Sequence, residues 1–144
     1  LQSNKAKVAA PLFHMIHSVD SLKILRALDA HAEQTLPILL QVNVAGEAAK
    51  FGLAPEAVRE VLEAANASVH CEVRGLMVIP PFSPDAEKTR ESFRALRLLR
   101  DRLEEETGTP LPELSMGMSH DLEVAIEEGS TWVRIGTDLF GARG

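Results

Sequence analysis

SMGMSHDLEVAIEEGSTWVRIGTDLFGARG, residues Ser115 to Gly144, contains two apolar runs separated by a stretch with helical spacing. Small polar residues and glycines cluster at the ends of both apolar runs. A strand, a helix and a second strand in this order form the repeating unit of a parallel sheet, because the helix carries the chain back to the start of the next strand. The segment therefore predicts an α/β fold whose functional loops lie where the strands end.

The same alternation extends back along the chain. Apolar runs of strand type occupy residues 13–19, 36–44, 73–81, 111–118 and 131–140, and stretches with helical spacing occupy residues 20–34, 53–67, 83–108 and 121–129. Asp20 or Ser21 is a candidate N-cap, Pro11 is expected to stop a short N-terminal helix, and Gly108 follows the end of the longest helix. The apolar stripe of that helix consists of Phe93, Leu96, Leu99 and Leu103.

Two architectures have this alternation: an open doubly wound sheet and a (β/α)8 barrel of the TIM type. A closed barrel typically needs about 250 residues, whereas this chain has 144. If the units belong to a barrel, they are about its last five β/α units, and roughly three N-terminal strands are missing. The first residue is Leu1 rather than methionine, so we expect residues 1–144 to be a single domain that is a processed or partial form of a longer barrel.

Composition excludes several classes of function. Hydrophobic residues make up 45% and charged residues 25% of the chain, the net charge is −6, and no block of basic residues occurs. A nucleic-acid-binding face would require clustered lysine and arginine. Cys71 is the single cysteine, which suits a reducing compartment. The sequence shows no charged-then-apolar leader and no apolar run near the ~20 residues of a membrane span, so we expect a soluble, cytoplasmic protein.

The C-terminal loops predict a phosphate site. Gly117 allows backbone to approach a ligand closely, and Ser119 lies at the expected start of a helix, where free N–H groups attract anions. Gly136 and Thr137 offer N–H groups and a hydroxyl after the next strand, and the last two strand ends of a barrel commonly hold phosphate. Arg134, two residues before Gly136, should point to the same side of its strand. These residues equally suit plain structural roles, with Ser119 as a helix cap, Gly136 in tight packing and Arg134 paired with a surface acid.

These motifs resemble those of the pyridoxal phosphate homeostasis proteins, a family of PLP-binding proteins with a barrel like the N-terminal domain of alanine racemase. The blocks LQSNK, IHSVDSLK, LLQVNVAGEAAKFGL, VRGLMVIPP and SMGMSHDLEVAIEEGSTWVRIGTDLFGAR carry the resemblance over essentially the whole chain. It implies a role in intracellular PLP homeostasis or carriage, with no catalytic residue and with PLP-dependent apoenzymes as possible recipients.

The resemblance also implies a set of cofactor-binding residues. The phosphate of pyridoxal 5′-phosphate would be held by Ser119, by backbone around Met118, and by Gly136 and Thr137. Arg134 would face the pyridine nitrogen and keep it unprotonated, because a fixed positive charge disfavours a second one nearby. Met77 would line the pocket. No metal is expected.

One feature of the resembled family is absent from the sequence. Its Schiff-base lysine lies on the first barrel strand, before the LQSNK block at which this chain begins. The lysines of the chain are Lys5, Lys7, Lys23, Lys50 and Lys88, and none is at the matching position. We therefore expect this chain to bind PLP weakly, non-covalently or not at all, and a truncated barrel to self-associate or to need its N-terminal part to cover its open edges.

The alternative function is a PLP-dependent, racemase-like enzyme acting on an amino acid. Such a racemase uses a tyrosine from a second domain, and this chain contains no tyrosine, which favours the carrier. A phosphate-sugar enzyme on the same architecture is a third reading, disfavoured by the motifs. His14 and His17 are read as core or strand-end histidines, His120 as an exposed residue of a first helical turn, and Trp132 as a packing residue. Cys71 has no neighbouring base motif that would make it a nucleophile.

Overall fold

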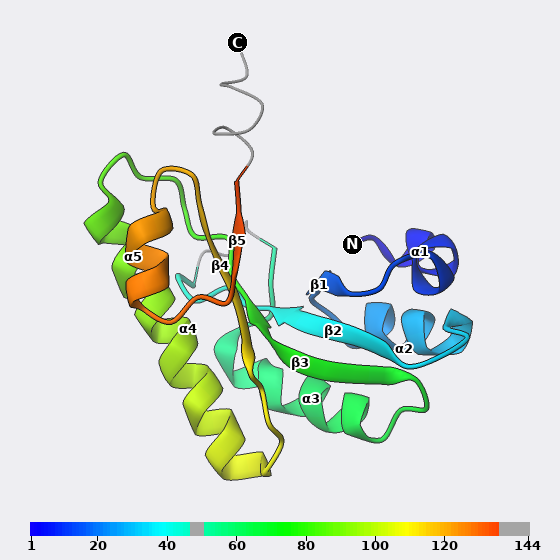
Figure 1. Cartoon of the computed structure of the whole chain (residues 1–144). Coiled ribbons are helices and arrows are strands. Elements are labelled where there is room, and N and C mark those ends of the chain that lie inside the picture. The colour runs from blue at the N-terminus through cyan, green and yellow to red at the C-terminus, as the bar shows by residue number, and fades with distance from the viewer. Residues whose placement is uncertain (47–50, 136–144) are drawn as a thin grey trace.

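Five parallel strands form one curled sheet in the order β1-β2-β3-β4-β5 (Figure 1). The structure is a computed structural model that describes residues 1–46 and 51–135. The strands are β1 (Ile16–Val19), β2 (Leu36–Gln41), β3 (Cys71–Met77), β4 (Glu113–Met118) and β5 (Trp132–Arg134). Each strand pairs with the next one along the chain. This sequential parallel order confirms the expected partial barrel and excludes the doubly wound sheet, whose strand order reverses.

Helices connect the strands and cover the convex face of the sheet. They are α1 (Ala6–Leu12), α2 (Leu22–His31), α3 (Val58–Asn66), α4 (Ala86–Thr107) and α5 (Leu122–Glu127), with short 3-10 helices at Ser3–Lys5 and Pro55–Ala57. Figure 1 shows α2, α3 and α4 along one side of the sheet, while α1 packs against α2. Among the described helices, none is both long and apolar enough to cross a membrane.

Local sequence explains where the helices begin and end. The Ser21 hydroxyl accepts a hydrogen bond from the Ile24 N–H and caps α2, which selects Ser21 from the two predicted caps. Gly108 ends α4 in the left-handed conformation, with φ of 72°. Pro11 lies inside the last turn of α1, which ends one residue later at Leu12, so the expected stop is displaced by one residue.

The two faces of the sheet differ in composition because side chains alternate along each strand. The side chains of Ile38, Leu40, Leu76 and Leu114 on the convex face join the main hydrophobic core, which also contains the predicted α4 stripe of Phe93, Leu96, Leu99 and Leu103. The alternate positions Leu39, Met77 and Ser115 are also buried but lie on the concave face. The concave face therefore carries a separate lining in which polar side chains occur.

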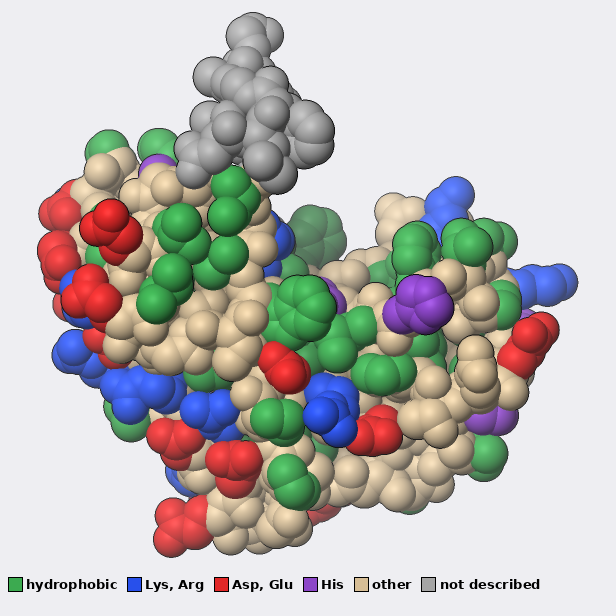
Figure 2. All heavy atoms as spheres, in the orientation of Figure 1, with side chains coloured by type: hydrophobic (Ala, Val, Ile, Leu, Met, Phe, Trp, Pro, Cys, Tyr) green, Lys and Arg blue, Asp and Glu red, His purple; other side chains and the backbone are tan. Residues whose placement is uncertain are grey.

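A cluster of ion pairs fastens α5 to α4. The Glu128 carboxylate, with a side chain only 6% exposed, pairs with Arg90, Arg94 and Arg97 at 2.9, 3.3 and 3.2 Å. These arginines hold the pKa of Glu128 at about 2, below its ordinary value. Figure 2 shows acidic and basic side chains intermixed over α4 and α5, and hydrophobic side chains in the hollow between β5 and α1.

Candidate functional site

Arg134 at the end of β5 reaches across the carboxyl ends of the neighbouring strands. Its Nη1 donates to the Ser115 hydroxyl on β4 at 3.0 Å, and its Nη2 donates to the Val78 carbonyl just beyond β3 at 2.9 Å. Burial lowers the pKa of Arg134 from its ordinary value, and the nearby Asp121 carboxylate opposes this effect. These bonds use two of the five guanidinium N–H groups, and the other three have no hydrogen-bond partner among residues 1–46 and 51–135.

The Ser115 hydroxyl connects Arg134 to His17 on β1. Ser115 is fully buried, and its Oγ lies 3.0 Å from His17 Nδ1. The His17 ring meets the Trp132 ring edge-on, with centroids 5.2 Å apart and planes at 85°. Burial and the charge of Arg134 lower the pKa of His17, partly offset by Glu113. The concave face therefore has a polar centre to which β1, β4 and β5 contribute.

The loop between β4 and α5 is closed by a buried carboxylate. Asp121 is 3% exposed, and its Oδ1 accepts from the Met118 N–H at 2.7 Å. Gly117 precedes this turn with φ of 104°, and a Cβ at that position would lie 2.5 Å from the Ala125 Cβ on α5. Strand and helix approach so closely here that only glycine leaves room.

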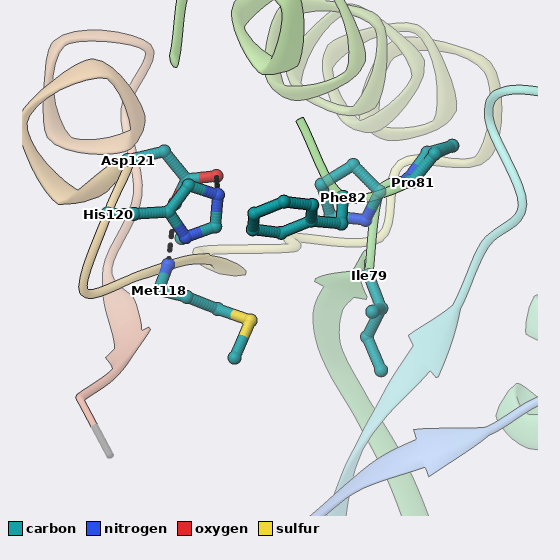
Figure 3. A pocket seen from close by; sticks show the side chains of 8 residues that line it. Ile79, Pro81, Phe82, Met118, His120 and Asp121 are labelled. Carbon is teal, nitrogen blue, oxygen red and sulfur yellow. Dashed lines mark hydrogen bonds and ion pairs between the residues drawn. The ribbon is translucent and has the colours of Figure 1, made fainter. Parts of the chain in front are cut away.

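A pocket of about 290 Å³ opens beside this loop, between it and the segment that follows β3. Figure 3 shows Phe82 pointing its ring toward His120, with Ile79 and Met118 below them. The Phe82 and His120 rings are 5.2 Å apart, and His120 Nε2 lies 3.5 Å from Asp121 Oδ2. The pocket therefore has a largely apolar wall, and one rim is formed by the β4–α5 loop.

The residues predicted from the sequence fall in three places. Met77 is buried on the concave face of β3, and Arg134 is the last residue of β5. Met118 is the last residue of β4, with its N–H already bonded to Asp121, and Ser119 is the first residue of the β4–α5 loop. Gly136 and Thr137 lie outside the described residues.

Sequence reasoning missed the partners of Arg134 and the role of Asp121. His17 was interpreted as a core or strand-end residue, and it proves to be half-buried and hydrogen-bonded to Ser115. Ser115 belongs to the C-terminal motif, but the sequence alone assigns it no role. The one available signal was the position of Ser115 two residues before Gly117, on the same face of its strand.

The remaining candidates have structural roles. Cys71 is buried, and burial raises the pKa of its thiol to about 12, which makes it unreactive. Trp132 is 45% exposed and donates through Nε1 to Glu113 at 2.8 Å, so it is less buried than a packing residue. His120 is exposed, as expected, but lies in the loop before α5. In the part of the chain that the structure describes, no group of three or more histidine, cysteine or acidic side chains could hold a metal.

Comparison with known sequences gives a consistent result. Residues 2–144 match the family model of the alanine racemase N-terminal domain. The chain is 46% identical to a pyridoxal phosphate homeostasis protein of Aquifex aeolicus and 48% identical to one of Pseudomonas aeruginosa, over 99% of its own length. It spans 64% and 62% of those relatives.

Comparison with solved structures supports the barrel. PipY of Synechococcus elongatus PCC7942, in a structure with PLP bound, superposes with a TM-score of 0.89 at 39% identity, covering 98% of this chain and 67% of PipY. Alanine racemase of Corynebacterium glutamicum superposes with a TM-score of 0.69 at 19% identity, covering 90% of this chain and 36% of the racemase. The second similarity concerns the fold alone.

Proposed function

The chain belongs to the family of alanine racemase N-terminal domains, and from that premise we propose that it binds pyridoxal 5′-phosphate and serves in PLP homeostasis or carriage without catalysing a reaction of its own. Residues 1–144 form a single domain, the C-terminal part of an alanine racemase-like PLP-binding barrel. Relatives named as homeostasis proteins, rather than as enzymes, support this reading. Handing the cofactor to PLP-dependent apoenzymes is part of the same proposal.

The observation that carries the proposal is the anchored guanidinium of Arg134. Its bonds to Ser115 and Val78 fix it at the carboxyl ends of the strands, and three of its N–H groups have no partner within the described part of the chain. A donor-only group in this place suits an unprotonated ring nitrogen, because arginine keeps its proton and disfavours a second positive charge nearby. Met77 on the same concave face supplies apolar contact for the ring.

The phosphate end of the ligand is assigned to the β4–α5 loop and to residues 136 and 137, which follow β5 in the sequence. We assign the phosphate to Ser119, Gly136 and Thr137. The N–H of Met118 is bonded to Asp121, so we assign Met118 to the pocket wall rather than to the phosphate. When bound, PLP supplies an aldehyde that combines with amines and a ring that withdraws electrons. The residues of this chain bind and orient the group.

A binding titration tests the proposal. The chain is titrated with PLP and with pyridoxal, which lacks the phosphate, and binding is followed by cofactor absorbance before and after dialysis. We expect PLP to bind more tightly than pyridoxal, and the double variant Ser119→Ala, Thr137→Ala to reduce this preference. Thr107→Ala is the matched control, because it removes one hydroxyl at the end of α4, which leads into the opposite end of the sheet.

Four results would contradict parts of the proposal. Equal affinity for PLP and pyridoxal, or a double variant that behaves like Thr107→Ala, would remove the phosphate assignment. Racemisation of an amino acid by the PLP-loaded protein, followed by circular dichroism, would favour the enzyme over the carrier. Trapping of PLP by borohydride on one of the five lysines would contradict the expectation that this chain lacks the covalent anchor.

A further inference from the structure

A chain of hydrogen bonds runs from β1 through β4 to β5 on the concave face. His17 Nδ1, Ser115 Oγ and Arg134 Nη1 follow one another with both distances at 3.0 Å. Arg134 is also fixed independently by the Val78 carbonyl at 2.9 Å. His17 is thus the end of a chain whose other end is the guanidinium assigned to the ligand.

The direction of each bond follows from the chemistry of its partners. Arginine only donates, so the Ser115 oxygen accepts from Arg134. The Ser115 proton is fully buried and needs an acceptor. Among the described residues, the remaining partner of this hydroxyl is His17 Nδ1. Ser115 therefore donates to an unprotonated Nδ1, and His17 carries its proton on Nε2.

We propose that His17 is a positioning residue, which acts through Ser115 to hold Arg134 in place for the ligand and releases this hold when it becomes protonated. A proton on Nδ1 would turn His17 into a donor toward Ser115. The hydroxyl would then face two donors, and its own proton would lose its acceptor. The identity of the ligand as PLP rests on the proposed function, whereas the hydrogen-bond chain does not.

Burial favours the neutral form of His17, and the two charges near it act in opposite directions. Arg134 on β5 opposes protonation, and Glu113 on β4 favours it. The Glu113 carboxylate is itself engaged by the Thr131 hydroxyl at 2.6 Å and by Trp132 Nε1 at 2.8 Å. Burial and the charge of Arg134 lower the pKa of His17, and Glu113 offsets them only in part, so the chain of hydrogen bonds is intact at pH 7 and breaks on acidification below the ordinary histidine range.

Trp132 offers a direct readout of this switch. It is the single tryptophan, and the sequence contains no tyrosine, so the intrinsic fluorescence excited at long wavelength comes from one indole. That indole lies edge-on to His17, and a protonated imidazole in contact with an indole quenches its fluorescence. A fall in emission on acidification therefore reports protonation of His17.

The first experiment uses the protein without ligand. Nitrogen NMR of the histidine side chains should show His17 as the Nε2–H tautomer, with a titration midpoint below the ordinary value of about 6.5. Trp132 emission should fall with the same midpoint. His17→Asn, which places an amide that does not titrate in this range near the position of Nδ1, should abolish that transition. His14→Asn is the matched control, because His14 is exposed three residues earlier and its loss should leave the transition unchanged.

The second experiment measures PLP affinity at pH 7.5. Ser115→Ala interrupts the chain and should weaken binding by roughly tenfold, the loss expected for one hydrogen bond to a charged group. His17→Phe removes the acceptor and should also weaken binding, whereas His17→Asn should restore most of the affinity. This rescue separates positioning from simple packing, because phenylalanine fills the site as well as histidine does.

Three outcomes would overturn the inference: an Nδ1–H tautomer of His17, a fluorescence transition that survives His17→Asn, or equal PLP affinity in the wild type and Ser115→Ala. If the ligand-free measurements agree with expectation but the wild-type chain binds no PLP, the proposed function fails and the hydrogen-bond chain is retained. The two hypotheses are therefore tested separately.

Discussion

Substitution of Gly117 by alanine tests how closely strand β4 and helix α5 must pack to shape the β4–α5 loop. A Cβ at residue 117 would lie 2.5 Å from the Ala125 Cβ, about 1 Å inside normal carbon–carbon contact. Ala125 is fully buried, and its Cβ is fixed to the helix backbone, so no rotamer change can relieve the contact. The backbone of α5 or of the loop must move instead.

The expected cost has two parts. The φ of 104° at Gly117 is unfavourable for an L-residue by about 1–2 kcal/mol. Inserting a methyl group into a packed region adds about 1–3 kcal/mol. We therefore expect Gly117→Ala to lower the free energy of unfolding by about 2–5 kcal/mol, and to weaken PLP binding because the Met118–Asp121 bond lies in the displaced loop.

Gly108→Ala is the matched control. Gly108 also has a positive φ, 72°, but an added Cβ there meets nothing within 4 Å. Gly108→Ala should lower the free energy of unfolding by the conformational cost alone, about 1–2 kcal/mol. Urea unfolding followed by Trp132 fluorescence and by far-UV circular dichroism measures both variants.

A double variant isolates the contact. Ala125→Gly costs about 1 kcal/mol as a glycine in a helix, but it removes the atom that the new methyl group meets. Combined with Gly117→Ala, it should recover about 1–3 kcal/mol relative to the sum of the single changes. The reasoning is refuted if Gly117→Ala and Gly108→Ala are equally destabilising, or if the two changes at 117 and 125 are additive.

Three further predictions concern ionisable side chains outside the β4–α5 loop. Asp29→Ala should lower the free energy of unfolding by about 1–3 kcal/mol in a urea titration, because the Asp29 carboxylate accepts backbone N–H bonds from Val69, His70 and Cys71 at 3.2, 2.6 and 3.1 Å. Glu128→Gln should flatten the acid limb of a stability–pH profile: the folded pKa of about 2 lies below the ordinary 4.5, so the wild-type contribution is complete above pH 4.5 and is lost as pH falls toward 2. The Cys71 thiol, with a pKa raised to about 12, should resist alkylation by iodoacetamide at pH 8 in the folded protein and react once urea unfolds it.

Much of the fold could be predicted from the sequence because it depends on local patterns. Four of the five strands and the four helices between them fall within the predicted ranges, whereas β3 begins at Cys71, two residues before its predicted range. The α4 stripe is buried as its spacing predicts. The apolar runs predict strands that are too long, however. For example, β5 spans only Trp132–Arg134 within the predicted range 131–140. Apolar residues in the loop beyond a strand look the same in the sequence as apolar residues that pair within the strand. Hydrophobicity therefore does not mark the residue at which a strand ends.

The site was predictable only in part, for a physical reason. Residue types and strand ends predict Arg134 and the β4–α5 loop as parts of the site, and this assignment stays a prediction. The bond between His17 and Ser115 joins residues 98 positions apart, and it depends on how strongly the sheet curls. Curvature is a property of the assembled sheet that no periodicity encodes, so the partners of Arg134 could not be read from the sequence.

The ion pairs between Glu128 and the three arginines of α4 affect the order in which parts of the molecule unfold. Helix α5 spans only Leu122–Glu127, far below the ~12–15 residues at which an isolated helix becomes even marginally stable. Helix α5 is therefore stabilised mainly by its ion pairs with the much longer α4. Salt weakens these ion pairs by screening their charges. Amide hydrogens of α5 and of the turn before it should exchange with deuterium together, and earlier at high ionic strength, as one subglobal opening unit that leaves the central strands closed.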